Sequence, residues 1–402
     1  MLKKLFKSPK RSNSMKLAIF YPYFNRQGGV EKIIDFYLKN LAEEKNVEIT
    51  CFGLRASAEI KNDYMAKVKF KELKIPLVNP FLTHLCFFSW ASWVVRFSKF
   101  DVYYSHFPIL SFNKNFLYHV HSVQRSVIRA IEKNNGWSGK LRYFLRRYYP
   151  LPIVLEKGAF RFHENKKFIA VSPKIKREII EEYKIPENAI VTIPAPIALE
   201  KFSFLNREKW QKEARGQYDF LSRPNWLWLG TVVNRLTGKN VRLMLQALTG
   251  VWRNVGLIIV GLPRKKDVMR LRRWLKALCL EKRVFFLGPQ SNLEKIYSLF
   301  DFFILPSFYE SFGLSVMESL LMGTPAIVSK EIGCVDFLPV EIKREMLIEL
   351  ADIKQEGELA AVLKTTKPLV MEGKTEKLSV LADYVRKLNI NGLTELKKLL
   401  NI

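Results

Sequence analysis

Short apolar runs alternate with longer segments of helical periodicity along most of this chain. In its first half the apolar runs span residues 17–22, 47–53, 101–105, 116–121, 167–172 and 191–194. A second set spans residues 226–230, 256–261, 284–288, 302–305 and 326–328. Strands that are apolar along their whole length are typical of parallel sheets covered by helices on both faces. The pattern therefore predicts two mainly parallel α/β units, joined by a linker near residues 202–224.

One strand-loop-helix-strand unit in the second half carries the most informative residues. The apolar run 302–305 predicts a strand, residues 314–322 have helical periodicity, and Gly323 ends that helix before the strand 326–328. The loop and the helix start therefore lie at the carboxyl edge of the sheet, where open α/β folds bind their ligands. Because the first N–H groups of a helix lack partners, this position favours an anion such as phosphate.

Two glutamates belong to this unit, Glu310 in the loop and Glu318 about two helical turns later. Ionised carboxylates only accept hydrogen bonds, so a pair beside an anion site suits the hydroxyl groups of a sugar and a ribose. In the alternative interpretation, Glu310 has a capping or surface role and Glu318 lies on a solvated helix face.

The spacing of these glutamates resembles the Glu-x7-Glu signature of family 4 of the retaining GT-B glycosyltransferases, also described as glycosyl transferases group 1. The resemblance extends to the strand 226–230, to Lys239-Asn240-Val241 and to the loop Gly28-Gly29-Val30-Glu31. It covers the chain from about Met15 to about Asp336. This likeness implies the GT-B architecture, an α/β fold with two Rossmann-like domains facing each other across a cleft.

The resemblance also assigns roles in that cleft. Glu310 would contact hydroxyls of the transferred sugar, and Glu318 would hold the ribose of the nucleotide. The backbone N–H groups of Phe312, Gly313 and Leu314 would bind the donor diphosphate.

Further donor contacts follow from the same resemblance. Lys239 matches a lysine that the family directs at the diphosphate, and Gly28 and Gly29 match the glycine loop placed against it. The family commonly has an arginine where this chain has Thr231, which leaves Arg235 as the candidate to reach in from a longer loop. The alternative is that Arg235 is a surface residue.

Histidines at strand ends are further candidates. His121 follows an apolar strand at the edge where the cleft should open, and it matches a histidine that the family places near the reacting sugar. A structural role is the alternative. His106 lies at an equivalent strand end, while His119 shares the strand face of His121 and is expected to be core.

Domain limits can be drawn from these patterns. We expect a flexible basic arm at residues 1–14, an acceptor-binding Rossmann-like domain at 15–205 and a nucleotide-sugar-binding Rossmann-like domain at 206–377. Residues 378–402 are expected to form a helical segment, which the resemblance suggests could return to the first domain.

The formal net charge of +28 indicates an anionic partner. Residues 125–149 carry many cations interleaved with aromatic side chains, which is typical of a segment that lies on an anionic membrane surface. A merely solvated basic surface is an alternative. Nucleic acid is a third, but the chain lacks a helix-turn-helix, a zinc finger and a ribonucleoprotein-type motif, so we do not expect it.

Residues 82–97 form the longest apolar stretch, which is too short for a comfortable membrane span. We expect a helix that is buried or lies at an interface. Four widely separated cysteines indicate neither a disulfide framework nor a zinc site, which favours a reducing cytoplasm.

The function expected from the sequence is that of a retaining hexosyltransferase. It would move a sugar from a nucleotide-diphosphate sugar, as co-substrate, to a membrane-associated glycolipid or lipid-linked glycan of the lipopolysaccharide or cell-surface-polysaccharide type. We expect no metal and no other cofactor, and a position in the cytoplasm, peripheral on the inner face of the cytoplasmic membrane. The alternative is a non-catalytic GT-B-like protein that binds a nucleotide or polyanion and docks on a membrane or partner.

Overall fold

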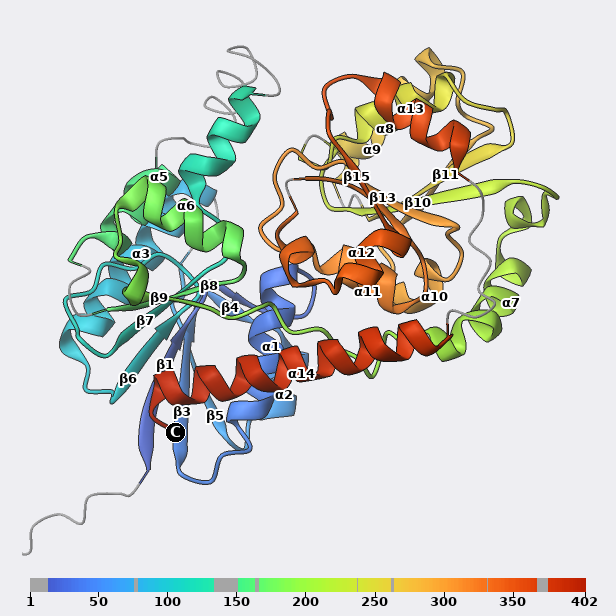
Figure 1. Cartoon of the computed structure of the whole chain (residues 1–402). Helices are drawn as coiled ribbons and strands as arrows, with labels where there is room; N and C mark the ends of the chain where they lie inside the picture. Colours follow the sequence, from blue (N-terminus) through green and yellow to red (C-terminus); the bar gives the residue numbers. More distant parts are fainter. Residues whose placement is uncertain are drawn as a thin grey trace, which may run out of the picture.

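The computed structural model describes residues 14–75, 79–133, 151–162, 166–236, 238–261, 264–330, 332–366 and 375–402. These residues form two α/β domains that lie side by side (Figure 1). The predicted fold, two Rossmann-like domains, is confirmed. All but one residue of the expected basic arm lies outside the described residues.

The first domain is built on a seven-stranded parallel sheet with the order β5-β3-β1-β6-β7-β8-β9. Its strands are β1 (Met15–Phe20), β3 (Val47–Gly53), β5 (Val68–Glu72), β6 (Val102–Ser105), β7 (Phe116–Val120), β8 (Lys167–Ala170) and β9 (Ile190–Thr192). Its helices include α1 (Gly29–Leu41), α2 (Ala58–Tyr64), α3 (Pro80–Phe97), α5 (Leu151–Phe160) and α6 (Pro173–Tyr183). A short parallel pair, β2 (Tyr23–Phe24) and β4 (Arg55–Ala56), lies beside it.

The second domain repeats this plan with a six-stranded parallel sheet of order β12-β11-β10-β13-β14-β15. Its strands are β10 (Leu227–Val233), β11 (Val255–Gly261), β12 (Val284–Gly288), β13 (Phe302–Leu305), β14 (Ala326–Ser329) and β15 (Leu347–Leu350). Its helices include α7 (Arg207–Gln217), α8 (Val241–Thr249), α9 (Lys265–Ala277), α10 (Leu293–Tyr297), α11 (Leu314–Leu321), α12 (Val340–Met346) and α13 (Glu356–Thr365).

Strand order reverses next to the first strand of each sheet. In the first sheet β1 lies between β3 and β6, and in the second β10 lies between β11 and β13. Connections on either side of such a strand lead to opposite faces of the sheet, so a crevice opens at its carboxyl end. Each domain thus offers one binding crevice, beyond β1 and β6 in the first and beyond β10 and β13 in the second.

The last helix, α14 (Thr375–Leu400), runs from the second domain back across the first (Figure 1). Near its start, Lys377 pairs with Glu345 at 2.5 Å, and near its end Lys397 pairs with Glu44 at 2.5 Å. In between, the Asn389 side chain donates to the carbonyl of Ile197 at 2.8 Å and accepts from its N–H at 3.1 Å. This helix is therefore packed against both domains.

The apolar stretch at residues 82–97 forms most of α3. Phe87 and Ala91 are buried against the sheet, but Trp93 and Phe97 are exposed on the outer side. The described residues include no helix that is both long and apolar enough to span a bilayer. One face of α3 is therefore buried, as the sequence predicted, and the opposite face is exposed.

Arg207, at the start of α7, joins the linker region to the second domain. It is buried, and it donates to the carbonyls of Met322 and Phe300 at 2.9 and 2.8 Å and to Thr324 Oγ1 at 2.5 Å. Burial lowers the pKa of this guanidinium to about 10, so it stays charged at neutral pH. Arg207→Met would leave three buried acceptors without a donor.

We expect Arg207→Met to reduce the free energy of unfolding by about 3 kcal/mol. Urea denaturation followed by circular dichroism measures this change. Exposed Arg215 on the same helix provides the control, since Arg215→Met should change stability by less than about 0.5 kcal/mol. Equal stabilities of the two variants would contradict the anchoring role of Arg207.

Candidate functional site

The candidate residues gather at the two crevices. Gly28 and Gly29 follow β1 and His106 follows β6 in the first domain, while Lys239 follows β10 and Glu310 follows β13 in the second. Because the carboxyl ends of parallel strands meet at one edge of a sheet, residues far apart in sequence come together there. The two crevices meet across the domain boundary, as the contacts below establish.

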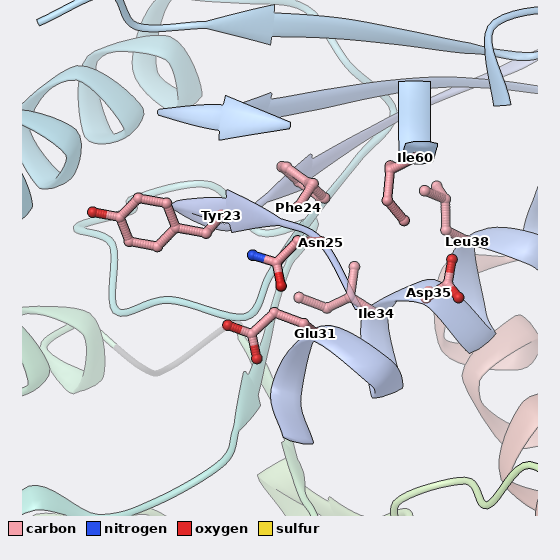
Figure 2. A pocket seen from close by; sticks show the side chains of 8 residues that line it. All are labelled: Tyr23, Phe24, Asn25, Glu31, Ile34, Asp35, Leu38 and Ile60. Atoms are coloured by element: carbon pink, nitrogen blue, oxygen red, sulfur yellow. The ribbon is translucent and has the colours of Figure 1, made fainter. Parts of the chain in front are cut away.

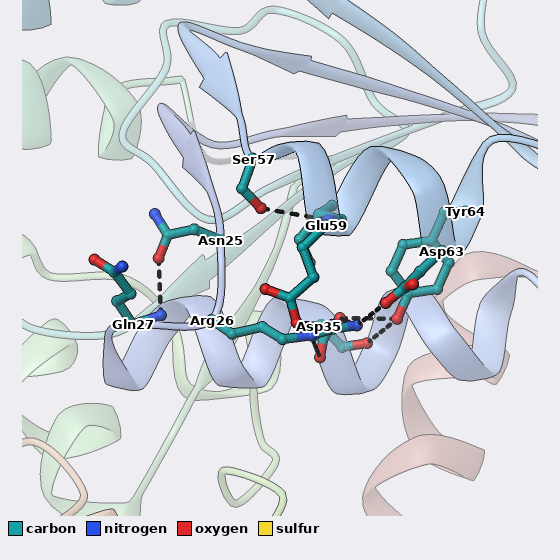
Figure 3. Close-up of polar contacts among 9 residues, drawn as sticks. Asn25, Arg26, Gln27, Asp35, Ser57, Glu59, Asp63 and Tyr64 are labelled. Atoms are coloured by element: carbon teal, nitrogen blue, oxygen red, sulfur yellow. Dashed lines mark hydrogen bonds and ion pairs between the residues drawn. The ribbon is translucent and has the colours of Figure 1, made fainter. Parts of the chain in front are cut away.

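An ion-pair network holds the glycine loop of the first domain in place (Figure 3). The guanidinium of Arg26, two residues before Gly28, contacts Asp35 on α1 at 2.8 Å and Glu59 and Asp63 on α2 at 2.5 and 2.7 Å. Tyr64 donates to Asp35 at 2.8 Å. A planar guanidinium that binds three carboxylates fixes the loop against two helices.

Glu31 folds over the start of this loop. A β-carbon added at Gly28 would lie 1.9 Å from Glu31 Oε2, so a larger residue there would displace the carboxylate from this position. The Tyr21 hydroxyl donates to Glu31 Oε1 at 3.1 Å. Burial raises the pKa of Glu31, and this outweighs the hydrogen bonds that lower it. Figure 2 shows Glu31 at the edge of a small hollow that Ile34 and Asp35 also line.

The two signature glutamates each bind a lysine. Glu310 forms a close ion pair with Lys239, and both side chains are about 20% exposed. Glu318 is nearly buried, accepting from the Tyr297 hydroxyl at 2.9 Å and from Lys32 Nζ at 2.9 Å. Since Lys32 lies on α1 of the first domain, this ion pair joins the two domains.

The start of α11 faces the glycine loop. Gly313 caps this helix with φ of +100°, a left-handed conformation that favours glycine. A β-carbon added at Gly29 would lie 3.6 Å from Leu314 Cδ1, so the predicted diphosphate contacts of the two domains are neighbours. Val316 donates the first hydrogen bond of the helix, to the Gly313 carbonyl at 2.9 Å, and the N–H groups that precede it are of the kind that favours an anion.

The loop that carries Glu310 is also docked on the first domain. Tyr309 donates to Glu178 Oε2 at 2.6 Å and accepts from the Val123 N–H at 3.3 Å. Ser172 Oγ donates to the carbonyl of Ser311 at 2.8 Å. These contacts join the loop to β8, α6 and the segment after β7, so the position of Glu310 depends on both domains.

Two family models match this chain. Residues 27–201 match Glycosyltransferase Family 4, and residues 228–339 match Glycosyl transferases group 1. The two matches contain the glycine loop and the two glutamates. The chain belongs to family 4 of the GT-B glycosyltransferases.

Individual relatives of this family 4 glycosyltransferase are distant. An uncharacterized glycosyltransferase, MJ1607 of Methanocaldococcus jannaschii, is 25% identical over 45% of this chain and 46% of its own length. The UDP-Gal:alpha-D-GlcNAc-diphosphoundecaprenol alpha-1,3-galactosyltransferase of Escherichia coli is 26% identical over 58% of this chain and 57% of its own. The chain spans about half the length of the curated relatives it matches, or less.

Solved structures support the same fold. WaaG, a glycosyltransferase involved in lipopolysaccharide biosynthesis, superposes with a TM-score of 0.71 over 93% of this chain and 95% of its own. Sequence identity in this superposition is 13%, so the likeness concerns the fold alone.

Not every site residue predicted for this family member lies beside the others. Arg235 lies in the loop after β10, where its side chain is exposed and makes no hydrogen bond or ion pair with the described residues. Its role as a diphosphate ligand stays a prediction. Lys32 is a cation already in the cleft, because it pairs with Glu318.

The three histidines form one cluster. His106 Nδ1 and His121 Nε2 share a hydrogen bond of 2.9 Å, and His119 Nδ1 shares one of 2.7 Å with the Tyr104 hydroxyl. Burial lowers the pKa of His121 to about 3 and holds those of His106 and His119 well below the usual value. All three rings are therefore neutral at physiological pH.

The cluster is also the one group of three candidate metal ligands in the described part of the chain, with ring nitrogens within 4.8 Å of one another. Nε2 of both His106 and His119 is buried without a hydrogen-bond partner. Neutral imidazoles of this kind suit a transition ion such as Zn²⁺. The absence of a metal requirement stays a prediction, which chelation can test.

The basic segment 125–149 is described only up to residue 133. Within that part, Arg129 forms a close ion pair with Glu182 on α6, and Arg125 lies 4.0 Å from the same carboxylate. Arg125 and Arg129 are thus opposed by a carboxylate from outside the basic segment. The remaining cations of the segment lie outside the described residues.

Several contacts of the site were not expected from the sequence. Lys32, Tyr297 and Tyr309 were assigned no role, although Lys32 follows the recognised glycine loop and Tyr309 precedes Glu310. The positions of Lys32 and Tyr309 beside recognised motifs could have indicated a role in the site. Their partners, however, lie 21 to 286 residues away in sequence.

The neutral histidines make stability depend on pH. The native pKa of His119 lies far below the value of about 6.5 in the unfolded chain, so the unfolded state binds more protons as the pH falls. The resulting stability is present above pH 6.5 and is lost below it. Glu156, whose pKa burial raises to about 8, acts in the opposite direction.

Comparison with His119→Gln isolates this contribution. Between pH 7 and pH 5, wild type should lose about 2 kcal/mol more unfolding free energy than the variant, while Glu156 affects both equally. Urea titrations at the two pH values measure the difference. Equal losses of unfolding free energy in wild type and variant would mean that His119 is not held neutral in the folded protein.

Proposed function

We propose that this protein is a retaining, metal-independent glycosyltransferase that uses a nucleotide-diphosphate sugar. One observation carries the proposal: Glu310, Glu318, Lys239 and the start of α11 meet the glycine loop and Lys32 of the first domain where the two domains touch. Carboxylates for hydroxyl groups and cations for a diphosphate are thus brought together. Retention of configuration is inferred from the family.

Donor binding would exchange partners within the site. Without donor, each lysine neutralises one carboxylate, Lys239 that of Glu310 and Lys32 that of Glu318. A donor brings an anionic diphosphate for the two lysines, together with sugar and ribose hydroxyls that donate to the two carboxylates. The released nucleoside diphosphate would be stabilised by these lysines and the positive end of α11.

A membrane-associated acceptor completes the proposal. The relatives described above include an enzyme named for a diphosphoundecaprenol acceptor and one involved in lipopolysaccharide biosynthesis. We propose a glycolipid or lipid-linked glycan acceptor, hexosyl transfer, and a cytoplasmic, peripheral location on the inner face of the membrane. The basic segment 125–149 would contribute to membrane binding.

A second candidate is a non-catalytic GT-B-like protein that binds a nucleotide or polyanion. Thr231 favours it, because it stands where the family commonly has an arginine for the diphosphate. The presence of both signature glutamates and of the glycine loop favours the enzyme.

Glu310→Ala tests the catalytic proposal. Loss of the carboxylate should lower sugar transfer at least about 100-fold, because the contacts to the transferred sugar are lost at the reacting end of the donor. The fold should stay intact, which near-ultraviolet circular dichroism checks. Glu281→Ala, at an exposed position of the same domain, is the control. Turnover near that of wild type in Glu310→Ala would refute the assignment.

Lys32→Gln tests the exchange of partners across the cleft. Because a charge-assisted contact to the diphosphate is lost, the donor Kd should rise about tenfold or more, as measured by calorimetry. Lys39→Gln removes an exposed cation from the same helix and should leave the Kd unchanged. An unaltered affinity in Lys32→Gln would exclude a phosphate contact by this lysine.

A panel of nucleotide sugars tests donor use and metal independence together. A donor that binds only the folded protein must raise its apparent stability. We expect one donor to raise the Tm, and this donor to be slowly hydrolysed in the presence of EDTA. Stabilisation without turnover would favour the binding protein, and turnover that requires added Zn²⁺ or Mg²⁺ would overturn metal independence.

A further inference from the structure

Helix α3 is apolar on nearly all sides, although one face is open to solvent. Arg96 is the single residue of Lys, Arg, Asp or Glu type among its 18 residues. A surface helix usually has a polar outer face. Here the outer face carries Trp93 and Phe97, which are 60% and 62% exposed. These side chains are four residues apart and lie on the same face of the helix.

Two more exposed rings continue this surface. Phe112, in the segment before β7, is 58% exposed, and Phe162, just after α5, is 47% exposed. The ring centroids of Phe112 and Phe162 are 4.6 Å apart, and those of Trp93 and Phe97 are 5.5 Å apart. We call Trp93, Phe97, Phe112 and Phe162 the aromatic patch.

Arginines join these rings into one surface. The Arg96 guanidinium lies 5.6 Å from the ring centroid of Phe97 and 5.8 Å from that of Phe112. Arg161 lies 5.1 Å from the centroid of Phe162. The patch therefore combines apolar rings with cations that are held at its surface by cation–π contacts.

The surroundings of the aromatic patch are basic. Lys99, Lys114 and Lys157 are exposed on the same elements or directly beside them. Neither α3 nor the segment 106–116 contains an acidic residue, and Glu156, the acidic residue of α5, is buried. An anionic partner would thus meet no opposing carboxylate on these elements.

A hollow of about 410 Å³ opens beside Arg96. Trp93, Val95, Phe97, Leu110 and Phe112 contribute its walls. The apolar walls of this hollow suit the glycerol region of a lipid, and the Arg96 guanidinium beside them suits the lipid phosphate. Figure 1 shows α3 and α5 on the side of the first domain that is away from the second domain.

We propose that the aromatic patch is a docking surface for an anionic lipid bilayer. Its rings would enter the interfacial region while Arg96 and Arg161 contact lipid phosphates. A second copy of the chain fits less well, because a two-fold contact would bring arginines and lysines against their own copies, with no exposed carboxylate from α3, α5 or the segment 106–116 between them. This docking surface rests on the proposed function in one respect, namely that the acceptor of that reaction is bound to a membrane.

Vesicle binding by the full-length protein tests this surface. The variant Trp93→Gln/Phe97→Gln/Phe112→Gln removes three rings and keeps every charge, and Trp252→Gln removes a ring that is 58% exposed in the second domain. On vesicles of phosphatidylcholine with phosphatidylglycerol, the triple variant should bind at least about tenfold more weakly than wild type, with Trp252→Gln unchanged. Arg96→Gln/Arg161→Gln should weaken binding to these vesicles but not to pure phosphatidylcholine, with less effect at high salt.

Binding of the triple variant at the wild-type level would overturn the proposal. So would equal binding of wild type to neutral and anionic vesicles, or a change of oligomeric state in the triple variant by sedimentation, which would assign the patch to a second copy or another protein. Stabilisation by the donor, measured on every variant, reports on the cleft. A lack of donor response alongside ring-dependent vesicle binding would refute the proposed function and leave the docking surface standing.

Discussion

The docking of the loop 309–313 onto the first domain is the constraint on which the site depends. Tyr309 and Ser311 form hydrogen bonds with Glu178 and Ser172, at positions that follow the carboxyl end of β8. Gly333 allows this close approach, because a β-carbon there would lie 2.0 Å from the Ser311 carbonyl oxygen and 2.7 Å from Ser172 Oγ. The same loop carries Glu310 and leads into α11. Domain arrangement and site geometry are therefore set by the same contacts.

Much of the fold could be predicted from the sequence because buried parallel strands are apolar along their length. The strand predicted at 302–305 agrees with β13, and that at 326–328 agrees with β14 to within one residue. The edge strands β5 and β15 were not predicted. In β5, Val68 and Phe70 alternate with lysines, since one side of an edge strand faces solvent, and this short pattern resembles a loop.

The site was predictable in its parts but not in its pairings. Motif positions identified Glu310, Glu318 and Lys239, since each follows a strand or lies on the helix after it. The ion pair of Glu318 with Lys32 joins residues 286 apart, and no local pattern signals such a contact. Arg235, in the loop after β10, has an exposed side chain, and its role as a phosphate ligand stays a prediction, because spacing along the sequence does not determine the conformation of a loop.

Helix α14 makes the first domain discontinuous along the chain. Its 26 residues span about 39 Å, and Leu396 and Leu400 near its end are fully buried. Gly392 lies against Ile193, where a β-carbon would be 3.0 Å from Ile193 Cγ2. A fragment that stops after the first sheet would lose this helix and expose the apolar surface it covers. The first domain is thus completed by residues that follow the second domain in the chain, so the second domain lies as an insertion within the first.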